Sequence, residues 1–319
     1  MDAEGRRRRR EEARRRTRRQ RKIALAAVLA LAALAVLALA TGGGVEDDGE
    51  RAESAVLPEL PRGGREILPR HHVVGFYGAP QDRELGALGV GTPDQAARRL
   101  RSQARPYARG GRPVLPAFEL IATIASNSPG ADGTYRNRQS PGTIRRYLAA
   151  ARRAKAILIL DIQPGRADFM SEVEPLRPFL EEPDVSLALD PEWHVGPGEV
   201  PGRTFGSVDA ATVNRISAML ADIVERRRLP QKLLLVHQFT PGMIQGKDQL
   251  EPQPGVALVV NVDGFGDRPV KIAKYREFTR GGHGRFHNGL KLFYREDTNL
   301  LRPRGVLGLR PRPEVVVYE

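Results

Sequence analysis

The chain of 319 residues contains no cysteine. This absence excludes disulfide bonds, thiolate zinc sites, cysteine nucleophiles and lipid attachment through an N-terminal cysteine. Tryptophan is nearly absent as well, because Trp193 is the only one in the chain. The fold must therefore be held by an apolar core, and a hydrophobic content of 40% is sufficient to form one.

The sequence also lacks the motifs of several common enzyme classes. The stretch FYGAPQDRELGALG, which follows the first apolar run of the C-terminal part, has no Gly-x-Gly-x-x-Gly spacing. No Walker loop, Gly-x-Ser-x-Gly elbow, His-x-His pair or His-Glu-x-x-His motif is present. We therefore expect no nucleotide cofactor and no dedicated metal site.

The positive charge is concentrated in a short N-terminal tail. Residues 1–22 carry eleven Arg and one Lys against four acidic residues, a net charge of +8 out of +13 for the whole chain. The remainder of the chain carries only +5. This distribution argues against a folded nucleic-acid-binding surface, and we expect no nucleic-acid partner.

An unbroken apolar segment follows this Arg-rich tail. Residues 23–40 read IALAAVLALAALAVLALA, eighteen apolar residues that nearly suffice to cross a bilayer core of about 30 Å. The positive-inside rule then predicts a single-pass transmembrane helix at 23–41, with a cytoplasmic N-terminus and the C-terminal domain outside the cell membrane. The alternative is a signal peptide cleaved near Ala40, because Ala38-Leu39-Ala40 fits a small-x-small cleavage site.

The exported part divides into a linker and one large domain. Residues 42–70 are rich in Gly, Glu, Asp and Pro without periodicity, which predicts a flexible stalk before an extracytoplasmic domain at 71–319. In that domain short, continuous apolar runs alternate with amphipathic stretches, as in parallel sheets buried on both faces. We expect strands at 72–77, 114–118, 156–161, 185–190, 232–237, 256–262, 290–294 and 314–318, and helices at 92–107, 141–155, 168–180, 209–228 and 270–279.

This order of elements predicts the fold class. Eight strands with helices between them, over about 250 residues, favour a TIM-like (β/α)8 barrel of the α/β class, lacking the last helix. A doubly wound open sheet is the alternative, and the missing glycine motif counts against it.

Most of the predicted strands end in polar residues. In a barrel the reacting groups lie at the carboxyl ends of the strands, so this recurrence predicts one shared site. The clearest case is LALDPEWHV, in which extended backbone would point Asp190, Glu192 and His194 to one side. The other candidates for this site are Tyr77, Glu119, Asp161, Gln163, Trp193, His237, Gln238, Asp263 and Tyr294.

Carboxylates gathered at a barrel mouth suit glycoside hydrolysis, in which one carboxyl is held protonated and another acts as nucleophile or base. We assign Glu192 as the acid, because a charged Asp190 two residues away would raise its pKa. Asp161 is the leading catalytic partner, with Glu119 and Asp263 as further candidates. Aromatic residues would lie against sugar rings, and Gln163, the histidines and Gln238 would bind hydroxyl groups.

Two other classes remain open. A metal-dependent hydrolase could take ligands from Asp161, Asp190, His194, His237 and Asp263, and a non-catalytic module could hold envelope glycan or a partner. The loop at 126–142 could form a lid or docking surface, and its Arg136 and Arg138 suit an anionic ligand. A lone histidine such as His237 is also common as a buried, hydrogen-bonded core residue.

Two resemblances bear on these alternatives. LALDPEW resembles the fourth strand of the chitinase-like barrels and the Chalaropsis-type lysozymes, whose Asp-x-Glu pair implies substrate-assisted or muramidase chemistry. The run of FYG, PAFELI, LDIQPGR, LALDPEW, VDGFG and KLFY looks like an uncharacterised family of exported, membrane-anchored bacterial proteins. The first implies a glycoside-hydrolase-like barrel, which in an exported protein would act on envelope polysaccharide; the second implies export and a membrane anchor and supplies no established activity.

Overall fold

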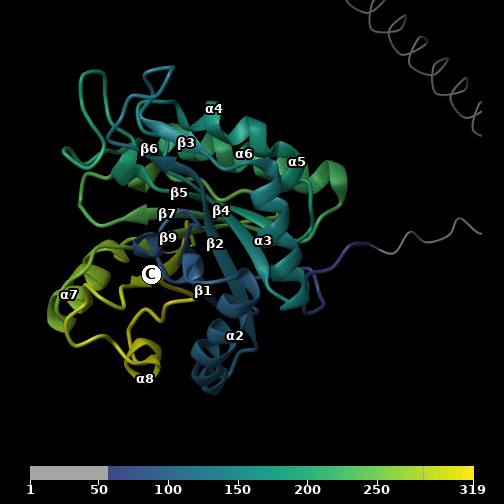
Figure 1. The fold of residues 1–319 in the computed structure, drawn as a ribbon. Coiled ribbons are helices and arrows are strands. Elements are labelled where there is room, and N and C mark those ends of the chain that lie inside the picture. The colour runs from purple at the N-terminus through teal and green to yellow at the C-terminus, as the bar shows by residue number, and fades with distance from the viewer. Residues whose placement is uncertain (1–56, 283) are drawn as a thin grey trace, which may run out of the picture. The chain divides into compact units, whose positions relative to one another are not determined.

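The computed structural model describes residues 57–282 and 284–319, which form a closed barrel of parallel strands (Figure 1). Each strand pairs in parallel with its two neighbours, and β1 pairs with both β2 and β11, which closes the sheet. The closure confirms the TIM-like fold and excludes the open doubly wound sheet. The barrel strands are β1 (His72–Gly78), β2 (Val114–Ala125), β4 (Ile157–Ile162), β5 (Val185–Leu189), β7 (Lys232–Gln238), β9 (Val256–Val262), β10 (His287–Leu292) and β11 (Val315–Tyr318).

Helices lie around the outside of the strands (Figure 1). Side-chain caps define where the longer ones begin: Thr92 and Gln95 form a capping box, and Ser140 and Asp209 accept hydrogen bonds from backbone amides. Prolines divide the predicted helix at 168–180 into two short helices around a 3-10 turn. The helices are α2 (Pro93–Ala104), α3 (Pro141–Arg153), α4 (Phe169–Val173), α5 (Arg177–Leu180), α6 (Ala210–Arg227), α7 (Arg268–Phe278) and α8 (Pro303–Leu307).

Three very short strands decorate the barrel. β3 (Arg136–Arg138) pairs antiparallel with the end of β2, and β6 (Val208–Asp209) pairs in parallel with β8 (Ile244–Gln245). The connection from β7 to β9 contains β8 and a 3-10 turn in place of an α-helix. The sequence predicted no helix there either, and α8 is the only α-helix among the described residues that it missed.

Alternation along each strand creates two separate apolar clusters. Side chains such as Val73, Ala117 and Ile159 point into the barrel and form an inner core. Their neighbours, such as Val74, Phe118 and Leu158, point outward and form a larger core under the helices. Because every second residue faces inward, a polar residue at an inward position in the middle of a strand is removed from water.

Residues 57–70 pack onto the barrel, although the sequence predicted them as the end of a flexible stalk. Leu60, Ile67 and Leu68 are buried against the inner core. The Gln231 side chain accepts hydrogen bonds from the backbone amides of Ile67 and Leu68 at 2.7 and 2.8 Å. The segment closes the amino-terminal end of the barrel, so the compact unit begins before residue 71.

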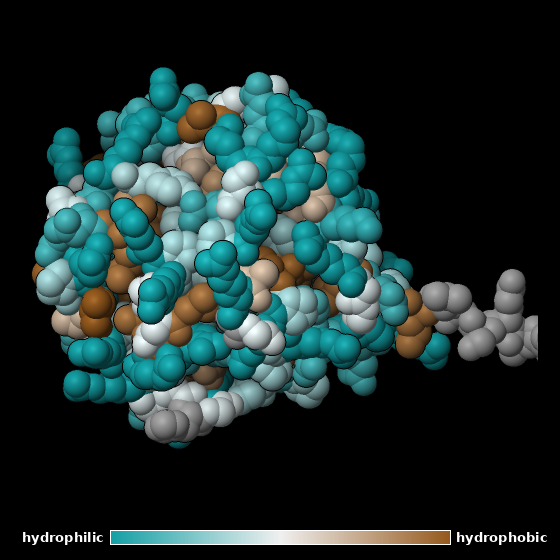
Figure 2. All heavy atoms as spheres, turned by 90° about the horizontal axis from the view of Figure 1, so that it is seen from below, coloured by the Kyte–Doolittle hydropathy of each residue, from teal (hydrophilic) through white to brown (hydrophobic). Residues whose placement is uncertain are grey.

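The predicted tail at 1–22, transmembrane helix at 23–41 and stalk residues 42–56 lie outside the described residues. Within the part that is described, no helix is both long and apolar enough to span a bilayer. On the face seen in Figure 2, hydrophobic side chains lie in small separate groups among hydrophilic ones.

The packing of Ile67 can be tested by truncation. We expect Ile67→Ala to lower the free energy of unfolding by about 2–5 kcal/mol, because it removes a side chain that is only 1% exposed. Leu57→Ala is the control in the same segment, with Leu57 42% exposed, and should change it by less than about 0.5 kcal/mol. Urea unfolding measures both. Equal effects of the two changes would mean that residues 57–70 are not part of the folded unit.

Candidate functional site

The carboxyl ends of the barrel strands point an unusual set of ionisable side chains inward. Glu119 on β2, Asp161 on β4 and His237 on β7 are each at most 1% exposed. All occupy the same inward alternation as the core residues below them. The other inward groups at this end are Tyr77, Asp190, Asp263, Lys291 and Glu319.

A cavity of about 460 Å³ opens at this end of the barrel. The sequence-predicted residues Tyr77, Gln163, Asp190, Glu192, Trp193 and Asp263 are part of its lining. It also brings in residues that sequence reasoning did not single out, namely Lys291, Glu319 and the phenylalanines 205, 239, 265 and 293. Six of the twelve residues predicted from the sequence thus line one cavity, together with carboxyl groups and aromatic rings.

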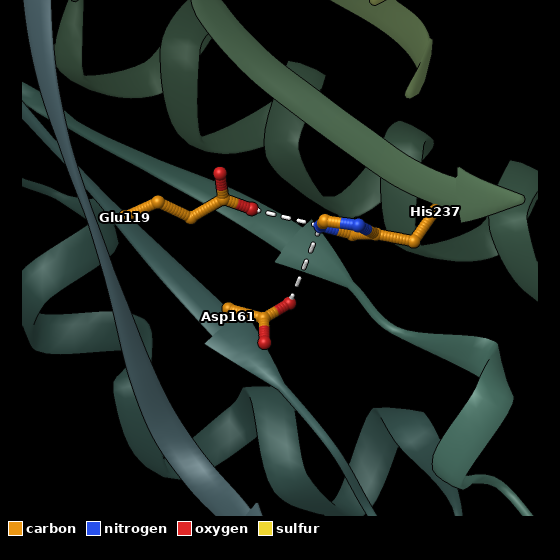
Figure 3. Close-up of side chains that lie close together, drawn as sticks. All are labelled: Glu119, Asp161 and His237. Carbon is orange, nitrogen blue, oxygen red and sulfur yellow. Dashed lines mark hydrogen bonds and ion pairs between the residues drawn. The ribbon is translucent and has the colours of Figure 1, made fainter. Parts of the chain in front are cut away.

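His237 is not in the lining of this cavity, and the carboxylates of Glu119 and Asp161 both point toward one nitrogen of its ring (Figure 3). Its Nε2 is 2.8 Å from Glu119 Oε1 and 3.9 Å from Asp161 Oδ1, and its Nδ1 is 2.8 Å from Asp263 Oδ2. Burial disfavours the charged ring, but Glu119 and Asp263 outweigh it and raise the pKa of His237 well above its ordinary value. A protonated ring donates from Nε2 to Glu119 and from Nδ1 to Asp263.

Tyr77 joins three of the predicted residues. Its hydroxyl lies 3.1 Å from Asp161 Oδ2 and 3.4 Å from Asp190 Oδ2, and it accepts a hydrogen bond of 2.8 Å from Gln163 Nε2. Burial first, and then the nearby carboxylates, raise the pKa of Tyr77 well above its ordinary value. Tyr77 is thus a neutral hydrogen-bond donor that orients two carboxyl groups.

Lys291 supplies the second buried cation of the site. Its Nζ lies 2.7 Å from Glu319 Oε2, 3.2 Å from Asp263 Oδ2 and 3.7 Å from the centre of the Tyr77 ring. Burial opposes its charge, yet Asp263 and Glu319 raise the pKa of Lys291 well above its ordinary value. The sequence carried a signal for it, because a lysine inside the apolar strand GLKLF is costly unless it is paired.

The carboxyl groups divide into two kinds. Burial, followed by the charge of Asp190, raises the pKa of Glu192 to about 8, and burial also raises the pKa of Asp190 and of Asp161. Burial would likewise favour the neutral form of Asp263, but Lys291 and His237 hold its pKa below the ordinary range. The main cause at Glu192 is therefore burial, with the predicted effect of Asp190 second.

Three sequence-predicted residues lie away from the cavity. Gln238 and Tyr294 directly follow inward residues and so point outward: Gln238 donates to the Thr240 carbonyl at 3.2 Å, and Tyr294 bonds Gln103 at 2.9 Å. His194 turns away because 191–193 form a 3-10 turn instead of extended backbone. Its Nδ1 donates to the Ser207 carbonyl at 2.7 Å.

The loop arginines are already paired. Arg136 and Arg138 donate to the buried carboxylate of Glu172 at distances between 2.7 and 2.9 Å. They therefore anchor β3 to α4, and the predicted use of the loop at 126–142 to hold an anion has no support from their contacts.

The raised pKa of Glu192 predicts how the stability of the protein depends on pH. Between about pH 4.5 and 8 the folded chain keeps a proton on Glu192 that the unfolded chain releases, so wild-type stability falls as the pH rises through this window. We expect Glu192→Gln to remove this loss and to raise the free energy of unfolding by roughly 1–4 kcal/mol at pH 8.

Urea unfolding across this pH range measures the difference between variant and wild type. The exposed Glu225, changed to Gln, is the matched control and should leave the pH profile unaltered. If the difference in the free energy of unfolding between Glu192→Gln and wild type does not increase with pH, the pKa of Glu192 is not raised by the fold.

No known family profile matches the chain, and no curated protein matches its sequence. The functional argument therefore rests on the geometry and electrostatics of the cavity.

Proposed function

We propose that the protein is a glycoside hydrolase that acts at the cavity of the barrel mouth. The observation that carries this proposal is the presence of two carboxyl groups with opposed pKa shifts in one cavity lining, Glu192 raised and Asp263 lowered. Glycosidases need such a pair, because one carboxyl must donate a proton while another stays ionised.

Glu192 is the general acid in this proposal. With a pKa of about 8 it holds a proton at neutral pH and lines the cavity, where it can protonate the leaving glycosidic oxygen. Asp190 lies next to it, is buried, and helps to keep that proton in place. Once the proton is transferred, Glu192 can act as the base that activates water.

Asp263 is the ionised partner. It accepts hydrogen bonds from Gly264 N at 2.6 Å and His237 Nδ1 at 2.8 Å, and it lies 3.2 Å from Lys291 Nζ. Its negative charge can stabilise an oxocarbenium-like transition state or attack the anomeric carbon. Asp161, the partner favoured by the sequence, lies below the cavity lining and acts here by positioning Tyr77 and His237.

The aromatic wall supports a sugar substrate. Trp193, Phe239 and Phe293 line the cavity together with Phe205 and Phe265, which are 62% and 63% exposed. Flat rings next to carboxylates suit pyranose rings, which have apolar faces and polar edges. Large exposed side chains at a cavity rim also suit a polymer that extends beyond the cavity.

The N-terminal sequence supports an envelope setting for this activity. We propose that residues 23–41 insert into the lipid bilayer as a single-pass anchor, with the N-terminus cytoplasmic and the barrel outside. Cell-envelope polysaccharide is then the substrate within reach. The resemblance to exported bacterial proteins with glycosidase-like barrels points the same way.

The activity can be tested on peptidoglycan and other envelope polysaccharides by measuring released reducing ends. We expect release by the wild-type chain and a fall of at least about 100-fold in Glu192→Gln, because the general acid is lost. Glu225→Gln is the matched control and should retain full activity, since its side chain is exposed. Circular dichroism confirms that both variants are folded.

Two results would count against this proposal. Full activity of Glu192→Gln would remove Glu192 as the acid. Equal binding of glycan by wild type and variant, with no release from any polysaccharide, would favour a binding module whose carboxylates only contact the sugar.

A metal-dependent hydrolase is the second candidate, favoured by the grouping of Glu119, Asp161 and His237 (Figure 3). One ligand atom of each lies within 4.8 Å of the others. Asp161 Oδ1 and Glu119 Oε2 are buried without hydrogen-bond partners, while Asp263 and Tyr77 hold the opposite side of His237 and Asp161. One imidazole and two carboxylates fit a divalent ion such as Zn²⁺ or Mn²⁺, which would supply Lewis-acid chemistry.

These three residues lie below the cavity and are not part of its lining. Glu192 and Asp263, by contrast, do line it. This separation is why we favour the carboxylate mechanism.

Elemental analysis decides between the two candidates. We expect the purified full-length protein to hold much less than one equivalent of metal and to stay active in EDTA. About one equivalent of metal, lost in Asp161→Asn and kept in the exposed control Asp248→Asn, would instead establish the metal site. Loss of activity in EDTA that Zn²⁺ or Mn²⁺ restores would do the same.

A further inference from the structure

A second cavity, of about 750 Å³, lies on the outside of the barrel at the opposite end from the candidate active site. Its lining includes Val256 and His287, the first residues of β9 and β10, and Glu314, which directly precedes β11. The barrel strands are parallel, so these residues mark the amino-terminal end of the barrel. The glycosidase proposal makes no use of this cavity.

The lining of this cavity is strongly basic. Four arginines, Arg276, Arg280, Arg285 and Arg310, face Glu314 as the only acidic residue in the lining. Glu314 is already neutralised, since it lies 2.7 Å from His287 Nδ1 and 3.0 Å from Arg112 Nη1. The four guanidinium charges are thus not balanced within the cavity.

Two of these arginines, Arg276 and Arg280, are available to a ligand. The other two already bind backbone carbonyls: Arg285 donates to the Asp248 carbonyl, and Arg310 donates to the Leu309 carbonyl at 2.7 Å. By contrast, Arg276 at the end of α7 and the nearby Arg280 are exposed and have no ion-pair partner in the part of the chain that the structure describes. Unpaired guanidinium groups that share a concave wall repel one another unless an anion lies between them.

A further polar group in the cavity points to a ligand. Asn288 is one of the lining residues, and its Oδ1 is buried without a hydrogen-bond partner. An amide oxygen accepts hydrogen bonds, so it can bind a donor group, such as a hydroxyl, in the part of the ligand next to the phosphate. Phe286 and Pro311 add an apolar surface to the same lining.

We propose that this cavity binds a phosphate group carried by a larger molecule. Arginines bind phosphate oxygens with two parallel hydrogen bonds, and several arginines around one cavity form the usual environment of a bound phosphate. The volume exceeds what a free phosphate ion needs and falls in the range of sites for drug-sized ligands. The apolar wall then contacts the body of the molecule.

The test measures phosphate binding by the full-length protein purified in detergent. The probes are inorganic phosphate and dihexanoylphosphatidylglycerol, a soluble lipid with a phosphate headgroup, each followed by ³¹P NMR line broadening. The test variant is Arg276→Gln/Arg280→Gln. The control is Arg98→Gln/Arg145→Gln, which removes the same charge from exposed positions on α2 and α3.

We expect saturable binding of at least one probe by the wild type and control, and a Kd at least about tenfold higher in the Arg276/Arg280 variant. Tighter binding of the lipid than of phosphate, abolished by the same variant, would identify a lipid headgroup as the source. The reverse order would identify a soluble phosphorylated ligand.

Two results would overturn the proposal: no saturable binding of either probe, or equal weakening in both double variants. The second result would reduce the effect to net charge. Reducing-end release is measured in parallel and should be unchanged in both double variants, so that failure here is distinct from failure of the glycosidase proposal.

Discussion

The structure depends on the pairing of buried charges at the carboxyl end of the barrel. A closed barrel forces every second residue inward, and at this end those residues include several carboxyl groups. Each would be strongly destabilising alone, because removing the partner of a buried ion costs about 3–5 kcal/mol. His237 and Lys291 make the arrangement possible by lying between Glu119, Asp263 and Glu319.

The two cations cannot neutralise every carboxyl group around them. Burial first, and then the charge of neighbouring carboxyl groups, raises the pKa of Asp161, Asp190 and Glu192, whereas Lys291 and His237 lower that of Asp263. A protonated carboxyl next to an ionised one is the requirement for acid catalysis of glycosidic cleavage. The proposed chemistry therefore follows from the charge balance that the fold imposes, and the same residues that destabilise the barrel supply its reactivity.

Much of the fold was predictable because buried parallel strands leave a strong sequence pattern. All eight barrel strands were predicted, although β2 continues seven residues beyond its predicted end at 118 and β10 begins three residues before its predicted start at 290. Runs such as ILILDI and VALVVNV made this possible, because they are apolar on both faces. The stalk was predicted too long. Leu60, Ile67 and Leu68 lie among Pro, Gly and charged residues, so they form no apolar run or periodic pattern. The burial of these three side chains depends on contacts with the end of the barrel, which a local sequence pattern does not show.

The site was predictable only in part. Inward and outward side chains alternate along each strand, so the direction of a side chain at a strand end depends on which residues of that strand face the core. Tyr77, Asp161 and His237 share the inward alternation, whereas Gln238 and Tyr294 are one residue out of step and point away. Lys291 was missed because the strand was predicted at 290–294, which placed Lys291 inside an apolar run, whereas β10 ends at Leu292. His194 was misplaced because Pro191 begins a 3-10 turn that ends the alternation.

The two proposed sites should act independently, and the barrel interior gives the reason. Apolar residues such as Val73, Leu235 and Val259 fill the space between the acidic end and the basic cavity at the opposite end. Charges exposed to water are screened over about 8–10 Å, so the arginines contribute little to the pKa of Glu192. Residues that share no partner have additive effects, so a ligand in the basic cavity should leave the acid at the opposite end unchanged.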